Sequence, residues 1–169
     1  ADRVAHFALI RARAEEMGSV LFNQLEEYLL RHHPQVTRVN LIGHSLGGRV
    51  VVTALKNRSL SKPREHPQIG DVLLMAAAAE ASSAEAAAML NWIEGRLINA
   101  YSKDDNVLRL NADEVCLGRN EIMFFENVHM QGFGHSDYWP KLRDVMKKAG
   151  FSALSRPTTG LAPQPENDF

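Results

Sequence analysis

Ser45 stands in the setting of a reactive side chain. The segment Gly43-His44-Ser45-Leu46-Gly47 fits the G-x-S-x-G pattern, in which serine occupies a sharp, strained turn between a strand and a helix. Residues 39–42 are mostly apolar, as in a buried strand, and the residues after Gly48 resemble an apolar, β-branched helix start. The bare pattern also occurs in ordinary strand–turn–helix units with a capping serine. The flanking residues favour the interpretation of Ser45 as a nucleophile that attacks an acyl carbon over that of a capping serine.

Two neighbours of Ser45 have expected roles. The first N–H groups of a helix lack an intrahelical acceptor, so we expect the Leu46 amide to face an oxyanion, helped by the helix dipole. His44 points away from the attacking face of Ser45, and we interpret it as a packing or supporting residue rather than the base. The glycines around Ser45 are expected to leave room for the turn, with Gly48 allowing close approach of helix and strand.

A nucleophilic serine needs a base, and the base needs an acceptor for its other ring nitrogen. The loop after the strand predicted at residues 96–101 offers two carboxylates. Asp105 is our choice of acid and Asp104 is the alternative, although either carboxylate could simply cap the loop.

The candidate base lies further along the chain. Gly134-His135 follows a weaker strand predicted at residues 128–130, and the glycine can present His135 at the strand end. His129 lies on that strand and is the weaker candidate. The order Ser45, Asp105, His135 then places each group after its own strand, an order typical of serine hydrolases.

The elements that must position these groups alternate between strands and helices. Such alternation predicts an α/β fold with a parallel, wound sheet and flanking helices, whose functional groups collect at the carboxyl ends of the strands. The pattern predicts strands at 39–42, 69–76, 96–101 and 128–130, and helices at 2–33 (with a possible break at Gly18-Ser19), 46–57, 82–92 and 140–149.

Length and composition predict one globular domain over residues 1–155 and a disordered tail over 156–169, which is rich in proline and polar residues. The 19 basic and 20 acidic residues form no strong cluster, so we expect no nucleic-acid partner. No apolar run reaches the roughly 18 residues of a spanning helix, so we expect a soluble chain without a transmembrane segment. Cys116 is the single cysteine, which excludes an intrachain disulfide.

These motifs together resemble those of the α/β-hydrolase superfamily, the serine esterases and lipases. The combination of residues 99–108 with Gly134-His135-Ser136-Asp137-Tyr138 looks most like lipase-like hydrolases related to transmembrane and coiled-coil domain proteins. The resemblance covers roughly residues 15–150. It implies hydrolysis of ester or lipid-like small molecules through an acyl-enzyme, with no cofactor and no metal. The roles it implies are Ser45 as nucleophile, Asp105 as acid, His135 as base and the Leu46 amide as oxyanion donor.

One departure from the resemblance concerns the chain before Ser45. Such hydrolases have several strands before the nucleophile strand, and a loop after one of them supplies a second oxyanion amide. This chain has only a predicted helix there, so it resembles the carboxyl-terminal half of the fold, lacking the usual first strands. We therefore expect an open sheet edge, and either a homo-oligomer or a second chain that completes the sheet. The alternative function is a non-catalytic, hydrolase-derived binding or scaffold module, or a fragment inactive without its amino-terminal half.

Overall fold

A computed structural model describes residues 2–59, 67–110 and 114–152 of the chain. Four parallel strands form one sheet in the order β1-β2-β3-β4, which is also their order in the sequence. The strands are β1 (Arg38–His44), β2 (Gln68–Met75), β3 (Leu97–Tyr101) and β4 (Glu126–His129). The predicted α/β class, with a parallel sheet and flanking helices, is confirmed at this level.

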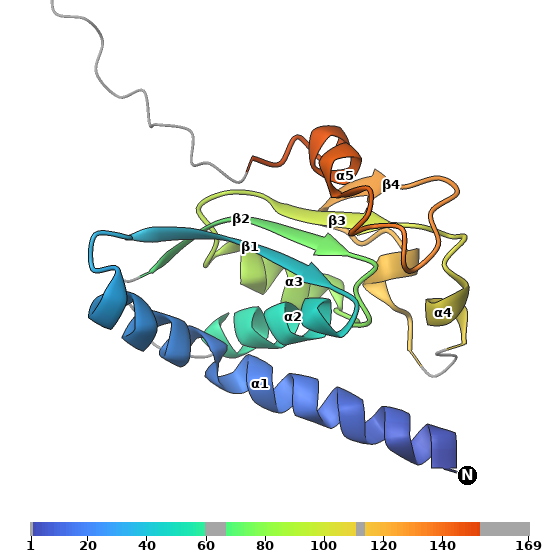
Figure 1. Cartoon of the computed structure of the whole chain (residues 1–169), viewed down its shortest axis with the longest axis horizontal. Coiled ribbons are helices and arrows are strands. Elements are labelled where there is room, and N and C mark those ends of the chain that lie inside the picture. The colour runs from blue at the N-terminus through green and yellow to red at the C-terminus, as the bar shows by residue number, and fades with distance from the viewer. Residues whose placement is uncertain (1, 60–66, 111–113, 153–169) are drawn as a thin grey trace, which may run out of the picture.

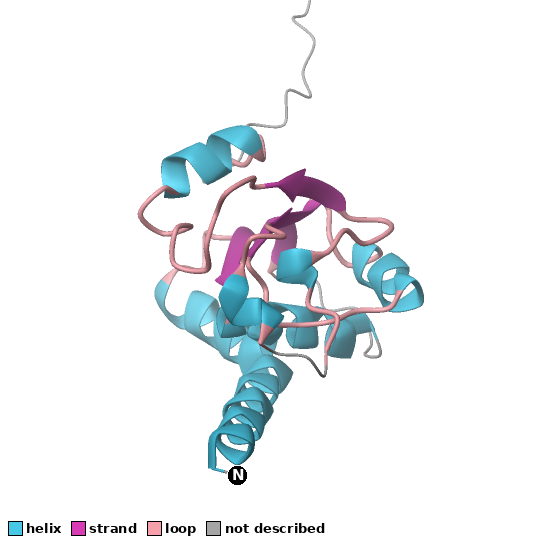
Figure 2. Ribbon diagram, turned by 90° about the vertical axis from the view of Figure 1, so that its right-hand side faces the viewer, coloured by secondary structure: helices cyan, strands magenta, loops and turns pink. Residues whose placement is uncertain are grey.

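Helices cover both faces of the sheet (Figures 1 and 2). On one side α2 and α3 pack on the strands and α1 lies outside α2, while α5 lies on the opposite side. The helices are α1 (Asp2–His32), α2 (Leu46–Ser59), α3 (Ser83–Leu90), α4 (Asn106–Arg109) and α5 (Leu142–Lys148), with a short 3-10 helix η1 (Leu117–Arg119). No helix in the described ranges is both long and apolar enough to cross a membrane.

Strand β2 lies between two hydrophobic clusters because its side chains alternate between the faces of the sheet. Val72 and Leu74 pack on the side of α2 and α3, whereas Leu73 and Met75 pack on the side of α5. All four side chains are fully buried. Burial of an aliphatic side chain of this size contributes about 1.5–3 kcal/mol, so β2 anchors both layers.

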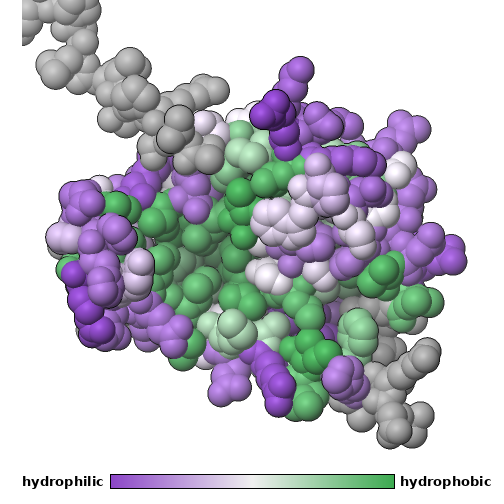
Figure 3. All heavy atoms as spheres, viewed as in Figure 1, coloured by the Kyte–Doolittle hydropathy of each residue, from purple (hydrophilic) through white to green (hydrophobic). Residues whose placement is uncertain are grey.

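Strand β1, by contrast, is an edge of the sheet. It pairs with β2 and with no other described strand. Val39, Leu41 and Ile42 are only partly buried, although their counterparts on β2 and β3 are shielded from solvent. In the view of Figure 1 this strand runs along the front, and Figure 3 shows apolar side chains gathered across the middle of that face. The open edge predicted from the sequence is therefore present in the described part of the chain.

The long first helix differs from its prediction at Gly18-Ser19, where α1 continues without a break. A Cβ on Gly18 would lie 2.6 Å from the Cβ of Thr53 in α2. The glycine thus serves close packing of two helices, so reading it as a helix breaker was wrong. The capping start predicted at Ser82 is confirmed as a complete capping box with Glu85. The predicted tail at 156–169 lies outside the described residues.

Candidate active site

Ser45 lies at the turn between β1 and α2, and its φ is +54°. A non-glycine residue in the left-handed region is uncommon and costs about 1–3 kcal/mol, so surrounding structure must impose it. The Ser45 amide donates to the Met75 carbonyl over 3.0 Å, and the Ser45 carbonyl accepts from the Ala78 amide over 3.0 Å. The end of β2 and the loop after it therefore hold the strained turn in place.

The glycines around the turn differ in how much room they need. A Cβ on Gly43 would lie 2.8 Å from the Gly47 carbonyl oxygen, and a Cβ on Gly48 would lie 2.6 Å from the Cβ of Ala77. A Cβ on Gly47 would meet nothing within 4 Å. The close approach of strand and helix at this turn therefore requires glycine at positions 43 and 48. At position 47, where glycine was also expected to be needed, a side chain would have room.

Ser45, His135 and Asp105 form a hydrogen-bonded chain, as their positions after separate strands predict. Ser45 Oγ lies 2.8 Å from His135 Nε2, and His135 Nδ1 lies 2.8 Å from Asp105 Oδ2. A carboxylate only accepts, so Nδ1 donates its proton to Asp105, which leaves Nε2 as the ring nitrogen that can accept from the Ser45 hydroxyl. In this geometry His135 Nε2 can accept a proton from the serine oxygen.

Asp105 is fully buried, and both of its oxygens have partners. It is the N-cap of α4, where Oδ1 accepts from the Leu108 amide over 3.0 Å while Oδ2 accepts from His135. A buried carboxylate would be costly without such hydrogen bonds. The capping role and the histidine-orienting role, which the sequence left as alternatives for this residue, are therefore combined in one side chain.

Asp104, the alternative acid weighed from the sequence, contacts the backbone of the loop before His135, whereas Asp105 is the carboxylate that contacts the His135 ring. Its Oδ2 accepts from the Gly132 amide over 2.9 Å. Asp137 makes a similar contact, with its Oδ2 accepting from the Gly134 amide over 2.6 Å. Two carboxylates thus hold the loop that presents His135. Sequence reasoning assigned neither role.

Leu46 opens α2 directly after Ser45, so its amide is among the N–H groups without an intrahelical acceptor. Among the described residues, no backbone hydrogen bond outside the helix uses this amide. Within the described residues it therefore has no backbone acceptor, and it directly follows the serine. The expected role of Leu46 as oxyanion donor remains a prediction.

Two other histidines weighed from the sequence make contacts with other groups. His129 ends β4, and its ring stacks on Tyr101 with the centroids 5.1 Å apart. His44 ends β1, and its Nε2 lies 2.9 Å from the His135 carbonyl oxygen. Neither ring contacts the serine hydroxyl in the described hydrogen bonds, whereas the His135 ring does.

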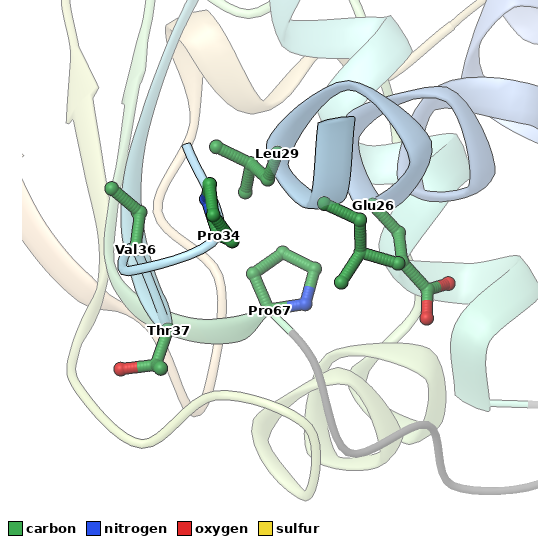
Figure 4. A pocket seen from close by; sticks show the side chains of 7 residues that line it. Glu26, Leu29, Pro34, Val36, Thr37 and Pro67 are labelled. Atoms are coloured by element: carbon green, nitrogen blue, oxygen red, sulfur yellow. The ribbon is translucent and has the colours of Figure 1, made fainter. Parts of the chain in front are cut away.

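A small pocket of about 80 Å³ lies at the other end of the sheet (Figure 4). It is formed by the end of α1, the turn before β1 and Pro67 just before β2, and Leu29, Pro34 and Val36 line it. Because the strands are parallel, this is the amino end of the sheet, opposite Ser45. In the described segments, no three His, Cys, Asp or Glu side chains are grouped as metal ligands.

Comparison with known proteins places the site in a family whose function is not known. The chain is 32% identical over 152 residues, 82% of its length, to an "Uncharacterized membrane protein F35D11.3" of Caenorhabditis elegans. It is 27% identical over 144 residues, 80% of its length, to "Transmembrane and coiled-coil domain-containing protein STS1" of Oryza sativa subsp. japonica. The matched regions are only 24% and 21% of those two proteins. No solved structure matches the chain significantly.

The resemblance drawn from the motifs must be corrected on this basis. The family that matches, over residues 5–152, is described as "Protein of unknown function (DUF726)", and no α/β-hydrolase family matches the chain. The expected membership of the α/β-hydrolase superfamily, in its lipase-like branch, is therefore wrong. Short motifs around a serine and a histidine can recur in unrelated families, because similar chemistry requires similar local geometry. With a match over most of its length, the chain belongs to the DUF726 family.

Proposed function

We propose that this protein is a serine hydrolase that cleaves carboxyl esters through an acyl-enzyme on Ser45. The observation that carries the proposal is the chain of two 2.8 Å hydrogen bonds from Ser45 through His135 to the buried Asp105. The positive φ of Ser45 supports it, because strained backbone tends to cluster at active sites. The order of the proposed nucleophile, acid and base along the chain, each after its own strand, also supports the proposal because it is typical of serine hydrolases.

The reaction follows from the arrangement of these groups. Ser45 Oγ attacks the ester carbonyl carbon as His135 Nε2 takes the hydroxyl proton, and Asp105 stabilises the imidazolium that forms. The tetrahedral intermediate collapses when its bond to the leaving oxygen breaks and His135 returns the proton to the leaving alkoxide. Water, activated by His135, then attacks the acyl-enzyme. The carboxylic acid leaves and Ser45 regains its proton.

The Leu46 amide is the proposed donor to the oxyanion of the tetrahedral intermediate. It lies at the start of α2, where the helix dipole also favours negative charge. Loss of one oxyanion donor typically costs on the order of 10²–10³ in rate. With one assigned donor we expect slow ester turnover by the isolated chain.

The open edge of β1 supports a second part of the proposal, which is association with a second copy or another chain. A strand that paired with β1 in parallel would end beside Ser45, since parallel strands share their carboxyl ends at one edge of the sheet. The loop after such a strand could supply a further backbone donor to the oxyanion. The proposed substrates are ester or lipid-like small molecules.

Labelling with a fluorophosphonate probe tests the hydrolase proposal directly. Such probes phosphonylate serine only where a base activates the hydroxyl. The expected result is one covalent adduct on the wild-type chain, mapped by mass spectrometry to Ser45, and no adduct on Ser45→Ala. Ser19→Ala is the matched control, because Ser19 is an exposed serine of α1.

The substrate side of the test uses p-nitrophenyl esters of increasing acyl length. Slow turnover that disappears in Ser45→Ala and persists in Ser19→Ala would agree with the proposal. Absence of labelling in the wild-type chain, or equal labelling in Ser45→Ala, would contradict it. In that case the non-catalytic binding module would become the leading function.

A further inference from the structure

His44 contacts the backbone of the residue proposed as the base. Its Nε2 lies 2.9 Å from the His135 carbonyl oxygen, and the two rings lie with their centroids 5.1 Å apart. The His44 ring also packs against Tyr138 and Trp139, at centroid distances of 5.8 and 6.0 Å. His44 therefore contacts the His135 loop at three of its residues, all from the end of β1.

The partner of His44 fixes its tautomer. A carbonyl oxygen only accepts, so Nε2 must carry the proton and donate it to His135. Burial lowers the pKa of His44 below the ordinary histidine value of 6.5, with the nearby His135 adding to the effect and the hydrogen bond opposing it. His44 is accordingly neutral at neutral pH. A neutral donor holds the loop without adding a positive charge next to the imidazolium that His135 must become.

We propose that His44 is a positioning residue, whose Nε2–H bond to the His135 carbonyl holds the base at the Ser45 hydroxyl. This inference rests on the proposed function, because the reaction it serves is the one proposed for Ser45. His44 precedes Ser45 on the same strand end, so one rigid element sets both the nucleophile and the base. Since a misplacement of about 1 Å can cost on the order of 10² in rate, such a link has catalytic value.

Two substitutions separate the hydrogen bond from the packing of the ring. His44→Gln keeps a neutral N–H donor at the same number of bonds from the backbone but removes the ring. His44→Phe keeps a ring against Tyr138 and Trp139 but removes the donor. Thermal unfolding of each variant checks that it folds.

The kinetic readout is kcat and KM for a p-nitrophenyl ester in the full chain. We expect His44→Phe to lower kcat on the order of 10- to 10²-fold with little change in KM, and His44→Gln to retain most of the wild-type kcat. A His44→Phe variant with wild-type kcat, or a His44→Gln variant as impaired as His44→Phe, would overturn the proposal.

A second readout does not depend on activity. Proton NMR of the ¹⁵N-histidine-labelled chain should show the His135 Nδ1–H proton, shifted downfield by its bond to Asp105, in the wild type and in His44→Gln. In His44→Phe that resonance should broaden or disappear as the ring loses its fixed position. If it persists unchanged there, His44 does not position the base. If it is lost in His44→Phe while the wild type fails to react with the fluorophosphonate, the positioning role stands and the proposed hydrolase function fails.

Discussion

The Gly132 amide donates a 2.9 Å hydrogen bond to Oδ2 of Asp104. Asp104 is the neighbour of the buried Asp105, so two consecutive carboxylates contact the same loop at different points. Asp105 contacts the His135 ring and Asp104 contacts the backbone that carries that ring. The first contact orients the ring of the proposed base directly, whereas the second only steadies the loop.

The two aspartates should therefore differ sharply when each is replaced. We expect Asp105→Ala to slow fluorophosphonate labelling of Ser45 on the order of 10³–10⁴-fold, since His135 loses the acceptor that fixes its tautomer. Asp104→Ala should slow labelling about 10-fold or less, and Asp104→Asn should restore most of that loss because an amide oxygen still accepts from Gly132. Equal losses in Asp104→Ala and Asp105→Ala would leave the acid unassigned.

Alanine substitutions at the turn should distinguish the glycines by stability. Gly43→Ala would force the new Cβ against the backbone of Gly47 and Gly48, so we expect a loss of about 1–3 kcal/mol in the free energy of unfolding. Gly47→Ala meets open space within α2 and should leave the melting temperature unchanged or raise it slightly. Circular dichroism during heating measures both. A stable Gly43→Ala variant would mean that the turn can open without cost.

The Asp71–Arg96 ion pair should make stability depend on pH. Burial raises the pKa of Asp71, but hydrogen bonds from the Arg96 side chain and backbone outweigh this effect, and the pKa is lowered overall. A carboxyl with a lowered pKa in the folded state stabilises it above its unfolded pKa of about 4, and that stability is lost as pH falls through the folded pKa. Stability should thus fall with acidification from about pH 4–5 downward.

The matching variant is Asp71→Asn, whose stability should be lower than wild type at neutral pH and less sensitive to acid. Urea unfolding at a series of pH values measures this difference. Asp144→Asn, at an exposed position of α5, controls for the loss of one negative charge. If wild type and Asp71→Asn lose stability in parallel as pH falls, the pair does not act as described.

The edge of β1 should drive association in solution. We expect light scattering to report a dimer or larger species for the isolated chain, because unpaired strand edges beside apolar side chains tend to pair with another strand. Val39→Lys should shift the population toward monomer by placing a charge at that edge. Leu30→Lys, at an exposed position of α1, adds the same charge elsewhere and should not. A wild-type chain that stays monomeric at high concentration would contradict this expectation.

Much of the candidate site could be predicted because its signals are local. The turn at Ser45 and the capping box at Ser82 are each specified by a few consecutive residues, and the structure has both. Each site residue follows its own predicted strand, and the rule for parallel sheets then predicts that the three residues lie close together. The sequence therefore predicted the proximity of Ser45, Asp105 and His135, and their catalytic roles stay predictions.

The contacts that escaped prediction are those between distant segments. Gly18 was interpreted as a possible helix break because glycine is unfavourable within a helix. Its close packing against Thr53 becomes evident only when α1 and α2 are placed together. Asp104 is 28 residues from Gly132, and nothing in either segment indicates the other. The family itself was misjudged for a related reason, since short catalytic motifs report local geometry and not descent.

The sheet order β1-β2-β3-β4 repeats the order of synthesis, so each strand pairs with the one translated just before it. Such sequence-local pairing lets a chain fold progressively as it leaves the ribosome. The partners of the Ser45 turn, Met75 and Ala78, are translated before Asp105. His135 comes last. A nascent chain that has not yet reached His135 carries a positioned serine without its histidine, so the proposed reactivity of Ser45 would arise only after His135 has been translated.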